Sequence, residues 1–133
     1  MKHLLKAALA ALALLLAAGA CQRAETRVQS VAETFLSAYY TGDYAAAATA
    51  CTPAFAKAVR YSAPDAALPE ETVQKIKEAL SRTSFEIVSV TVDKDAASAV
   101  VRYDLSVPGL GKPVPKALSL QLEGRTALVD GIQ

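Results

Sequence analysis

The stretch VAETFLSAYYTGDYAAAATACTPAF, residues 31–55, contains a helix, a turn and the start of further helices. Its apolar residues recur at intervals of three and four, which places them on one face of an amphipathic helix. Gly42 is suited to ending this helix, and Asp43 is suited to capping the next one. Two amphipathic helices joined by a tight turn are therefore predicted. Their apolar faces comprise Val28, Val31, Ala32, Phe35, Leu36 and Tyr39 in the first, and Tyr44, Ala47, Ala48 and Cys51 in the second.

Two more helices are predicted after this stretch. Thr52 followed by Pro53 is a cap with a first-turn proline, so a short helix begins there and carries Phe55 and Val59. After a proline-containing loop, Pro69 opens a fourth helix, whose first turn holds two glutamates that suit the helix dipole. The buried side of this fourth helix is expected to comprise Val73, Ile76, Ala79 and Leu80.

The second half of the chain changes to the two-residue period of β-strands. Turn-forming segments, among them PGLGKPVP (108–115), separate four β-rich segments. The order of helices first and strands afterwards predicts an α+β fold, with the N-terminal helices packed on one face of a curled antiparallel sheet. The segments are FEIVSVTV (85–92), SAVVRYDLSV (98–107), KALSLQLE (116–123) and GRTALVDGI (124–132). The inward positions are Val101, Tyr103, Leu105, Val107, Leu118, Leu120 and Leu122, followed in the last strand by either Ala127 and Val129 or Leu128.

The N-terminus has the pattern of a cleaved targeting signal. A basic start, MKHLLK, precedes an unbroken run of Ala and Leu over residues 7–18. This run is shorter than the roughly 20 residues that a membrane-spanning helix needs. Small residues then precede Cys21, so cleavage between Ala20 and Cys21 is predicted. The expected organisation is a removed signal peptide (1–20), a short tether (21–26) and one α+β domain (27–133).

The sequence AGAC, residues 18–21, resembles the lipoprotein box of bacteria, although Ala18 stands where that box most often has Leu. The resemblance implies that the Cys21 thiol carries diacylglycerol and that its freed amine is acylated, for example with palmitate. Two or three chains give durable anchoring, whereas one chain holds only marginally. Gln22 is not the Asp associated with inner-membrane retention, which favours the outer membrane. The alternative is ordinary signal cleavage and an unanchored secreted protein.

Charge and composition exclude several classes of partner. Removal of residues 1–20 takes away Lys2 and Lys6, leaving 12 of the 14 Lys and Arg against 13 Asp and Glu. No basic run remains, so nucleic acid is not an expected partner. The single histidine, His3, lies in the signal, and the mature chain shows no set of metal ligands, so no metal or cofactor is expected.

The segment VAETFLSAYYTGDYAAAATACTPAF, with the later strands, resembles the nuclear-transport-factor-2-like fold over residues 26–132. It is similar in particular to small bacterial lipoproteins of unknown function with such a domain, although the closing strand lacks the tryptophan often found there. The resemblance implies a cone in which the sheet curls around the helices and leaves a pocket. We expect that pocket to be lined by Phe35, Tyr39, Tyr103 and Leu120, and to suit a small apolar ligand. The family includes isomerases and dehydratases as well as proteins without known activity, so the fold does not assign a function.

Two carboxylates near tyrosines are the candidate acids or bases. Asp43 lies beside Tyr39, Tyr40 and Tyr44, but its place before a helix favours a capping role. Asp104 follows Tyr103 but alternates outward with Arg102 and Ser106, which favours a solvated side chain. No residue is assigned a catalytic role. Cys51 is expected to be a small buried hydrophobic residue, or a disulfide partner of Cys21 if Cys21 is not lipidated.

These features favour a lipid-anchored binding or interaction module of the cell envelope that is not an enzyme. Its partners are the membrane through Cys21 and either a small apolar ligand or a protein, including a second copy. A homodimer would use the outer face of the sheet, which carries Arg102, Asp104, Ser119 and Gln121. The alternative is an envelope enzyme of the isomerase or dehydratase type that uses Asp43 or Asp104 with tyrosines.

Overall fold

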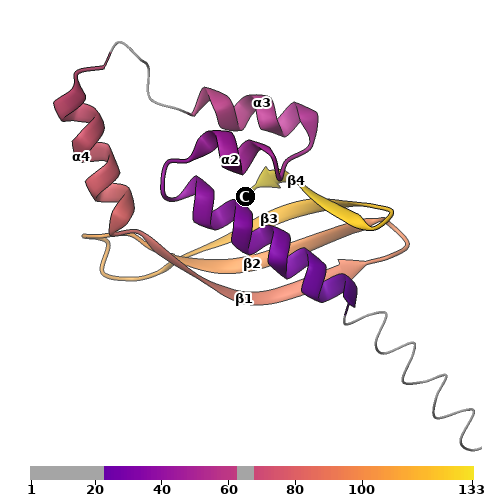
Figure 1. Ribbon diagram of the computed structural model, residues 1–133. Helices are drawn as coiled ribbons and strands as arrows, with labels where there is room; N and C mark the ends of the chain where they lie inside the picture. Colours follow the sequence, from indigo (N-terminus) through magenta and orange to yellow (C-terminus); the bar gives the residue numbers. More distant parts are fainter. Residues whose placement is uncertain (1–22, 63–67) are drawn as a thin grey trace, which may run out of the picture.

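Helices cover one face of a four-stranded antiparallel sheet in this computed structural model, which describes residues 23–62 and 68–133. The strands pair in the order β1-β2-β3-β4, and the sheet twists beneath the helices (Figure 1). The predicted α+β class, with N-terminal helices on an antiparallel sheet, is confirmed. The elements are a first helix over residues 23–39, α2 (Tyr44–Ala48), α3 (Pro53–Tyr61), α4 (Glu70–Ser81), β1 (Ser84–Asp93), β2 (Ser98–Ser106), β3 (Val114–Glu123) and β4 (Thr126–Ile132).

The predicted signal peptide, the cleavage site at Ala20 and Cys21, and the lipidation of Cys21 lie outside the described residues. Within the described ranges, no helix has the length and hydrophobicity needed to cross a membrane.

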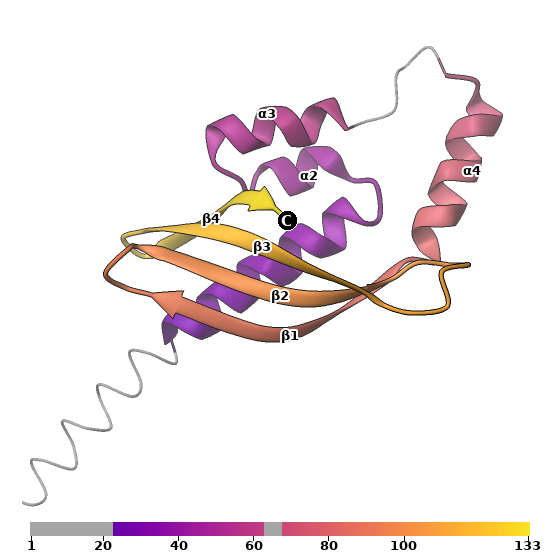
Figure 2. The same ribbon diagram turned by 180° about the vertical axis from the view of Figure 1, so that it is seen from behind.

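The first helix crosses the sheet diagonally, as the two opposite views show (Figures 1 and 2). Its side chains Val28, Ala32, Phe35 and Leu36 are fully buried, so the predicted apolar stripe faces the sheet. The spacing of these residues gave one continuous apolar face, which the helix buries against the strands.

The turn between the first helix and α2 follows the predicted chemistry. Gly42 has φ +85°, a conformation that a side chain with a Cβ adopts only with strain. The Asp43 carboxylate accepts a hydrogen bond from the Ala46 backbone N–H at 3.2 Å and so caps α2. The helix–turn–helix prediction from this segment is therefore confirmed.

The prediction that Cys51 lies on the second helix is wrong, because α2 ends at Ala48. Cys51 instead forms a single parallel bridge with Val129 of β4. The Thr52 N–H donates to the Val129 carbonyl at 2.9 Å, and the Val129 N–H donates to the Ala50 carbonyl at 2.8 Å. These long-range hydrogen bonds satisfy the edge of β4, and they require an extended chain at the position where the helical pattern continues.

The fourth helix departs from its prediction. None of its residues is buried: Val73, Ile76 and Leu80 are half-buried, and Ala79 is exposed. Figure 1 shows α4 at the side of the molecule, away from the face of the sheet that the other helices cover. The apolar spacing of α4 correctly predicted a helix, but the burial of its apolar side depends on the position of α4 relative to the sheet.

The core lies between the first helix, α2, α3 and the inner face of the sheet. On β2, Val101, Tyr103 and Leu105 are buried, as their alternation predicts. In β4 the inward positions are Ala127 and Val129, which settles the choice that the sequence left open. Two register shifts interrupt the ladders: Val88 of β1 is the extra residue opposite β2, and Asp130 of β4 is the extra residue opposite β3.

Candidate functional site

The four residues predicted to line a pocket come together as packed core. Phe35, Tyr103 and Leu120 are buried, and Tyr39 is half-buried against them. Phe35 stacks on Tyr39 with their ring centroids 5.4 Å apart. These side chains occupy the space between the first helix and the sheet, and the groove described below lies beside them.

Tyrosines surround this layer, and two of them share a partly buried hydrogen bond. The hydroxyls of Tyr40 and Tyr103 are 2.9 Å apart, and the Tyr103 side chain is only 1% exposed. Burial raises the pKa of Tyr103 well above its usual range, and it also raises the pKa of Tyr40 and of Tyr44. All three phenols therefore stay protonated at neutral pH and have no tendency to act as bases.

Neither candidate carboxylate has a hydrogen bond with these tyrosine hydroxyls among the described residues, although Tyr103 and Asp104 line the same surface hollow. Asp43 caps α2 on an exposed turn, as its position in the sequence predicted. Asp104 is half-buried on β2, where it shares a surface hollow of about 320 Å³ with the cations Arg102 and Lys116. The structure thus does not place either carboxylate against an enclosed space with a hydroxyl donor opposite.

Cys51 is a buried thiol with a single local contact. Its Sγ donates a hydrogen bond to the Ala47 carbonyl at 3.2 Å. Burial raises the pKa of this thiol to about 11, so it stays protonated and unreactive at neutral pH. No group of three or more His, Cys, Asp or Glu side chains suited to a metal ion occurs in the part of the chain that the structure describes.

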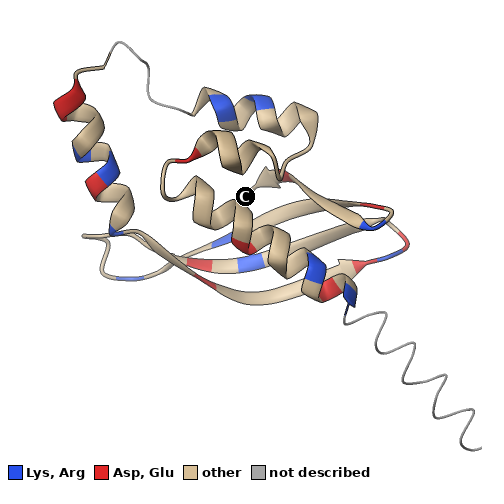
Figure 3. Ribbon diagram, viewed as in Figure 1, with Lys and Arg blue, Asp and Glu red and all other residues tan. Residues whose placement is uncertain are grey.

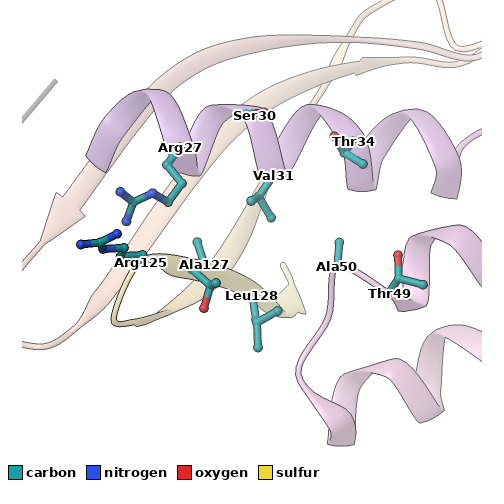
Figure 4. Close-up of a pocket in the computed structure, with 10 residues that line it drawn as sticks. Arg27, Ser30, Val31, Thr34, Thr49, Ala50, Arg125, Ala127 and Leu128 are labelled. Carbon is teal, nitrogen blue, oxygen red and sulfur yellow. The ribbon is translucent and has the colours of Figure 1, made fainter. Parts of the chain in front are cut away.

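A groove opens between the first helix, the end of α2 and the β3–β4 hairpin (Figure 4). We call it the helix–hairpin groove. It has a volume of about 430 Å³. Its walls are mostly apolar, and its polar groups are hydroxyls and guanidiniums. The lining residues are Arg27, Ser30, Val31, Thr34, Thr49, Ala50, Arg125, Thr126, Ala127 and Leu128.

Two arginines lie at one end of the groove. Figure 4 shows the side chains of Arg27, from the first helix, and Arg125, from the hairpin turn, extending to the same end. Neither guanidinium has a hydrogen bond or ion pair with any described residue. The described lining of the groove contains no carboxylate, and two neighbouring cations form a favourable position for an anion, because an arginine can bind an oxyanion through two parallel N–H groups.

The hydroxyls along the groove differ in their availability. Thr49 and Thr126 donate to the carbonyls of Ala46 and Glu123 at 2.6 and 2.8 Å, so these two hydroxyl protons are already used. Ser30 and Thr34, on the first helix, line the groove and have no hydrogen bond with the described residues. The helical wall of the groove therefore carries two hydroxyls that are not used within the described residues; Ser30 lies one turn from Arg27, and Thr34 lies toward the other end of the groove (Figure 4).

The residues of the helix–hairpin groove are not recognisable as a site in the sequence alone. The helical spacing of Arg27, Val31 and Thr34 is visible in the sequence and places them on one side of the first helix. Arg125, however, lies in the turn after Gly124, and its meeting with Arg27 depends on how the hairpin lies against the helix. That arrangement carries no local signal.

Comparisons with known proteins give one similarity of fold. No model of a known protein family matches the chain, and no curated protein sequence matches it. Among solved structures, an NTF2-like protein of unknown function from Cytophaga hutchinsonii is similar, with 12% sequence identity and a TM-score of 0.40. The similarity covers 79% of this chain and 87% of that protein.

Proposed function

We propose that this protein is a lipid-anchored module of the bacterial cell envelope that binds a small ligand in the helix–hairpin groove and carries out no reaction. The observation that carries the proposal is the groove itself. Its volume of about 430 Å³ falls within the range of small-molecule sites, roughly 300–1,000 Å³. Apolar walls with a few convergent polar groups are also typical of such sites.

The composition of the groove supports binding rather than catalysis. Its lining residues include no carboxylate, thiol or imidazole, the groups that most often transfer protons or attack a substrate. The two carboxylates of the alternative, enzymatic hypothesis are a helix cap, Asp43, and a residue of the surface hollow, Asp104. An isomerase or dehydratase would need one of them inside the site.

The anchor would hold the groove close to the membrane. Arg27 follows Cys21 by six residues, which span at most about 20 Å even when fully extended. A lipid on Cys21 would therefore keep the arginine end of the groove near the bilayer surface. The resemblance of AGAC to the lipoprotein box supports this anchor, and Gln22 favours the outer membrane.

The intact mass of the protein extracted from expressing bacterial membranes tests the anchor. We expect the mass of a chain beginning at Cys21 plus several hundred daltons of acyl groups, and we expect that addition to disappear in the Cys21→Ser variant. Cys51→Ser is the matched control, because its thiol is buried and its lipid content should not change. A mature chain without acyl groups would refute the anchor, and the further loss of two hydrogens would reveal a Cys21–Cys51 disulfide instead.

A further inference from the structure

We propose that the helix–hairpin groove binds an amphipathic anion, with the oxyanion on Arg27 and Arg125 and a short aliphatic chain along the apolar walls. This inference rests on the proposed binding function and specifies the chemical class of the ligand. A medium-chain carboxylate is the simplest molecule of this class.

The two arginines indicate that the head group of the ligand is an oxyanion. Both guanidiniums lie at one end of the groove, and neither has a partner among the described residues. A carboxylate has two oxygens that accept several hydrogen bonds, so it can engage both guanidiniums at once. Acidic and basic residues are interspersed along the described chain (Figure 3), so the local arginine pair, rather than a general positive field, would attract the anion.

The apolar walls of the groove indicate that the rest of the ligand is an aliphatic chain. Beyond the arginines the groove is bounded by Val31, Ala50, Ala127 and Leu128, whose side chains present only carbon. Burial of each methylene is worth about 0.8 kcal/mol, so an aliphatic chain gains affinity there while a second charged group does not. The hydroxyls of Ser30 and Thr34, which have no hydrogen bond with the described residues, can donate to water at the rim.

A free amphiphile fits these features better than contact with the membrane surface alone. Phosphate headgroups would satisfy the arginines but would leave the apolar walls unused. An aliphatic chain with an anionic head uses both parts of the groove. The same chemistry occurs in free carboxylates and in anionic lipids, so the experiment must separate these two sources.

The test is a titration of the full chain in zwitterionic detergent micelles with sodium hexanoate, followed through the side-chain N–H signals of its arginines. Arg27→Gln and Arg125→Gln assign the two groove signals and remove one guanidinium each. Arg60→Gln, an exposed arginine on α3 outside the groove, is the matched control. Acetate, hexanol and hexylamine serve as probes that lack the chain, the charge or the correct sign.

Hexanoate should shift the signals of Arg27 and Arg125 and leave that of Arg60 unchanged. Each groove variant should weaken binding by roughly ten- to a hundredfold, the usual effect of losing hydrogen bonds to a charged group. From acetate to hexanoate, affinity should rise about two- to fourfold for each methylene. Added salt should weaken binding, because the arginine end is open to solvent.

The other outcomes overturn different parts of the reasoning. Equal binding of hexanol, unaffected by the glutamine variants, would overturn the anionic class but would leave a binding groove. Equal binding of acetate would overturn the role of the apolar walls. If micelles containing phosphatidylglycerol shift the two arginine signals and hexanoate does not, the anion is a membrane lipid and the free carboxylate is excluded. If no probe binds to a correctly lipidated protein, the groove is not the ligand site while the anchor stands.

Discussion

The hydrogen bond between Tyr40 and Tyr103 predicts different losses of stability when one or the other tyrosine is replaced. The two hydroxyls lie 2.9 Å apart, but Tyr103 is 1% exposed whereas Tyr40 is half-buried. Replacing either tyrosine with phenylalanine removes the same hydrogen bond. The two variants differ in the hydroxyl that is left behind, and this difference determines the loss of stability.

In Tyr40→Phe the Tyr103 hydroxyl remains buried without a partner, which costs about 1–3 kcal/mol of the free energy of unfolding. In Tyr103→Phe the remaining hydroxyl of Tyr40 can turn to water, so the loss is about 0.5–1.5 kcal/mol. The double variant leaves no unpaired hydroxyl. It should therefore be less destabilised than the sum of the single variants, with a coupling of about 1 kcal/mol.

Urea unfolding followed by far-ultraviolet circular dichroism measures these three differences in the unlipidated Cys21→Ser background. For a domain of this size, each kilocalorie also lowers Tm by about 4 °C, which gives an independent check. The reasoning would be refuted if Tyr103→Phe cost more than Tyr40→Phe. It would also fail if the losses of the single variants simply added in the double variant.

Substitutions at Cys51 and Asp43 give two further predictions about the free energy of unfolding. Burial raises the Cys51 pKa from 9.0 to about 11, so above pH 9 the thiol of the unfolded chain loses its proton before that of the folded protein. The contribution of Cys51 to the free energy of unfolding should therefore be intact below pH 9 and decrease by about 2–3 kcal/mol as the pH rises from 9 to 11. Denaturation across this range should show a smaller decrease in Cys51→Ala, and an equal decrease would contradict the burial argument. Asp43→Ala should lose about 1 kcal/mol in thermal unfolding because it removes the cap of α2, whereas Asp43→Asn should lose little. Equal losses in the two variants would show that capping is not what Asp43 contributes.

Local patterns in the sequence predicted most of the elements. The apolar stripe of the first helix, the Gly42–Asp43 turn, the proline start of α3 and the alternation in β2 all depend on neighbours within a few residues. The sequence also indicated the structural roles of two candidate residues, Asp43 as a helix cap and Cys51 as a buried thiol. Helix period, caps and strand alternation act at short range, so one sequence suffices to see them.

Contacts between distant segments decided the rest. The extended segment around Cys51 follows from hydrogen bonds to Val129, and the exposure of α4 follows from its position beside the sheet. Only the fold packs Phe35 and Tyr103 into a closed layer while leaving an open groove next to them.

The sequence by itself determined most of the helices and strands and most of their inward faces, because these reflect the spacing of residues along the chain. The tertiary structure alone brought Arg27 of the first helix and Arg125 of the β3–β4 turn to the same end of one groove. Their meeting depends on how the hairpin packs against the helix, and the packing free energy that sets this position is spread over the whole core. No local pattern records it, which is why the candidate site emerged only from the fold.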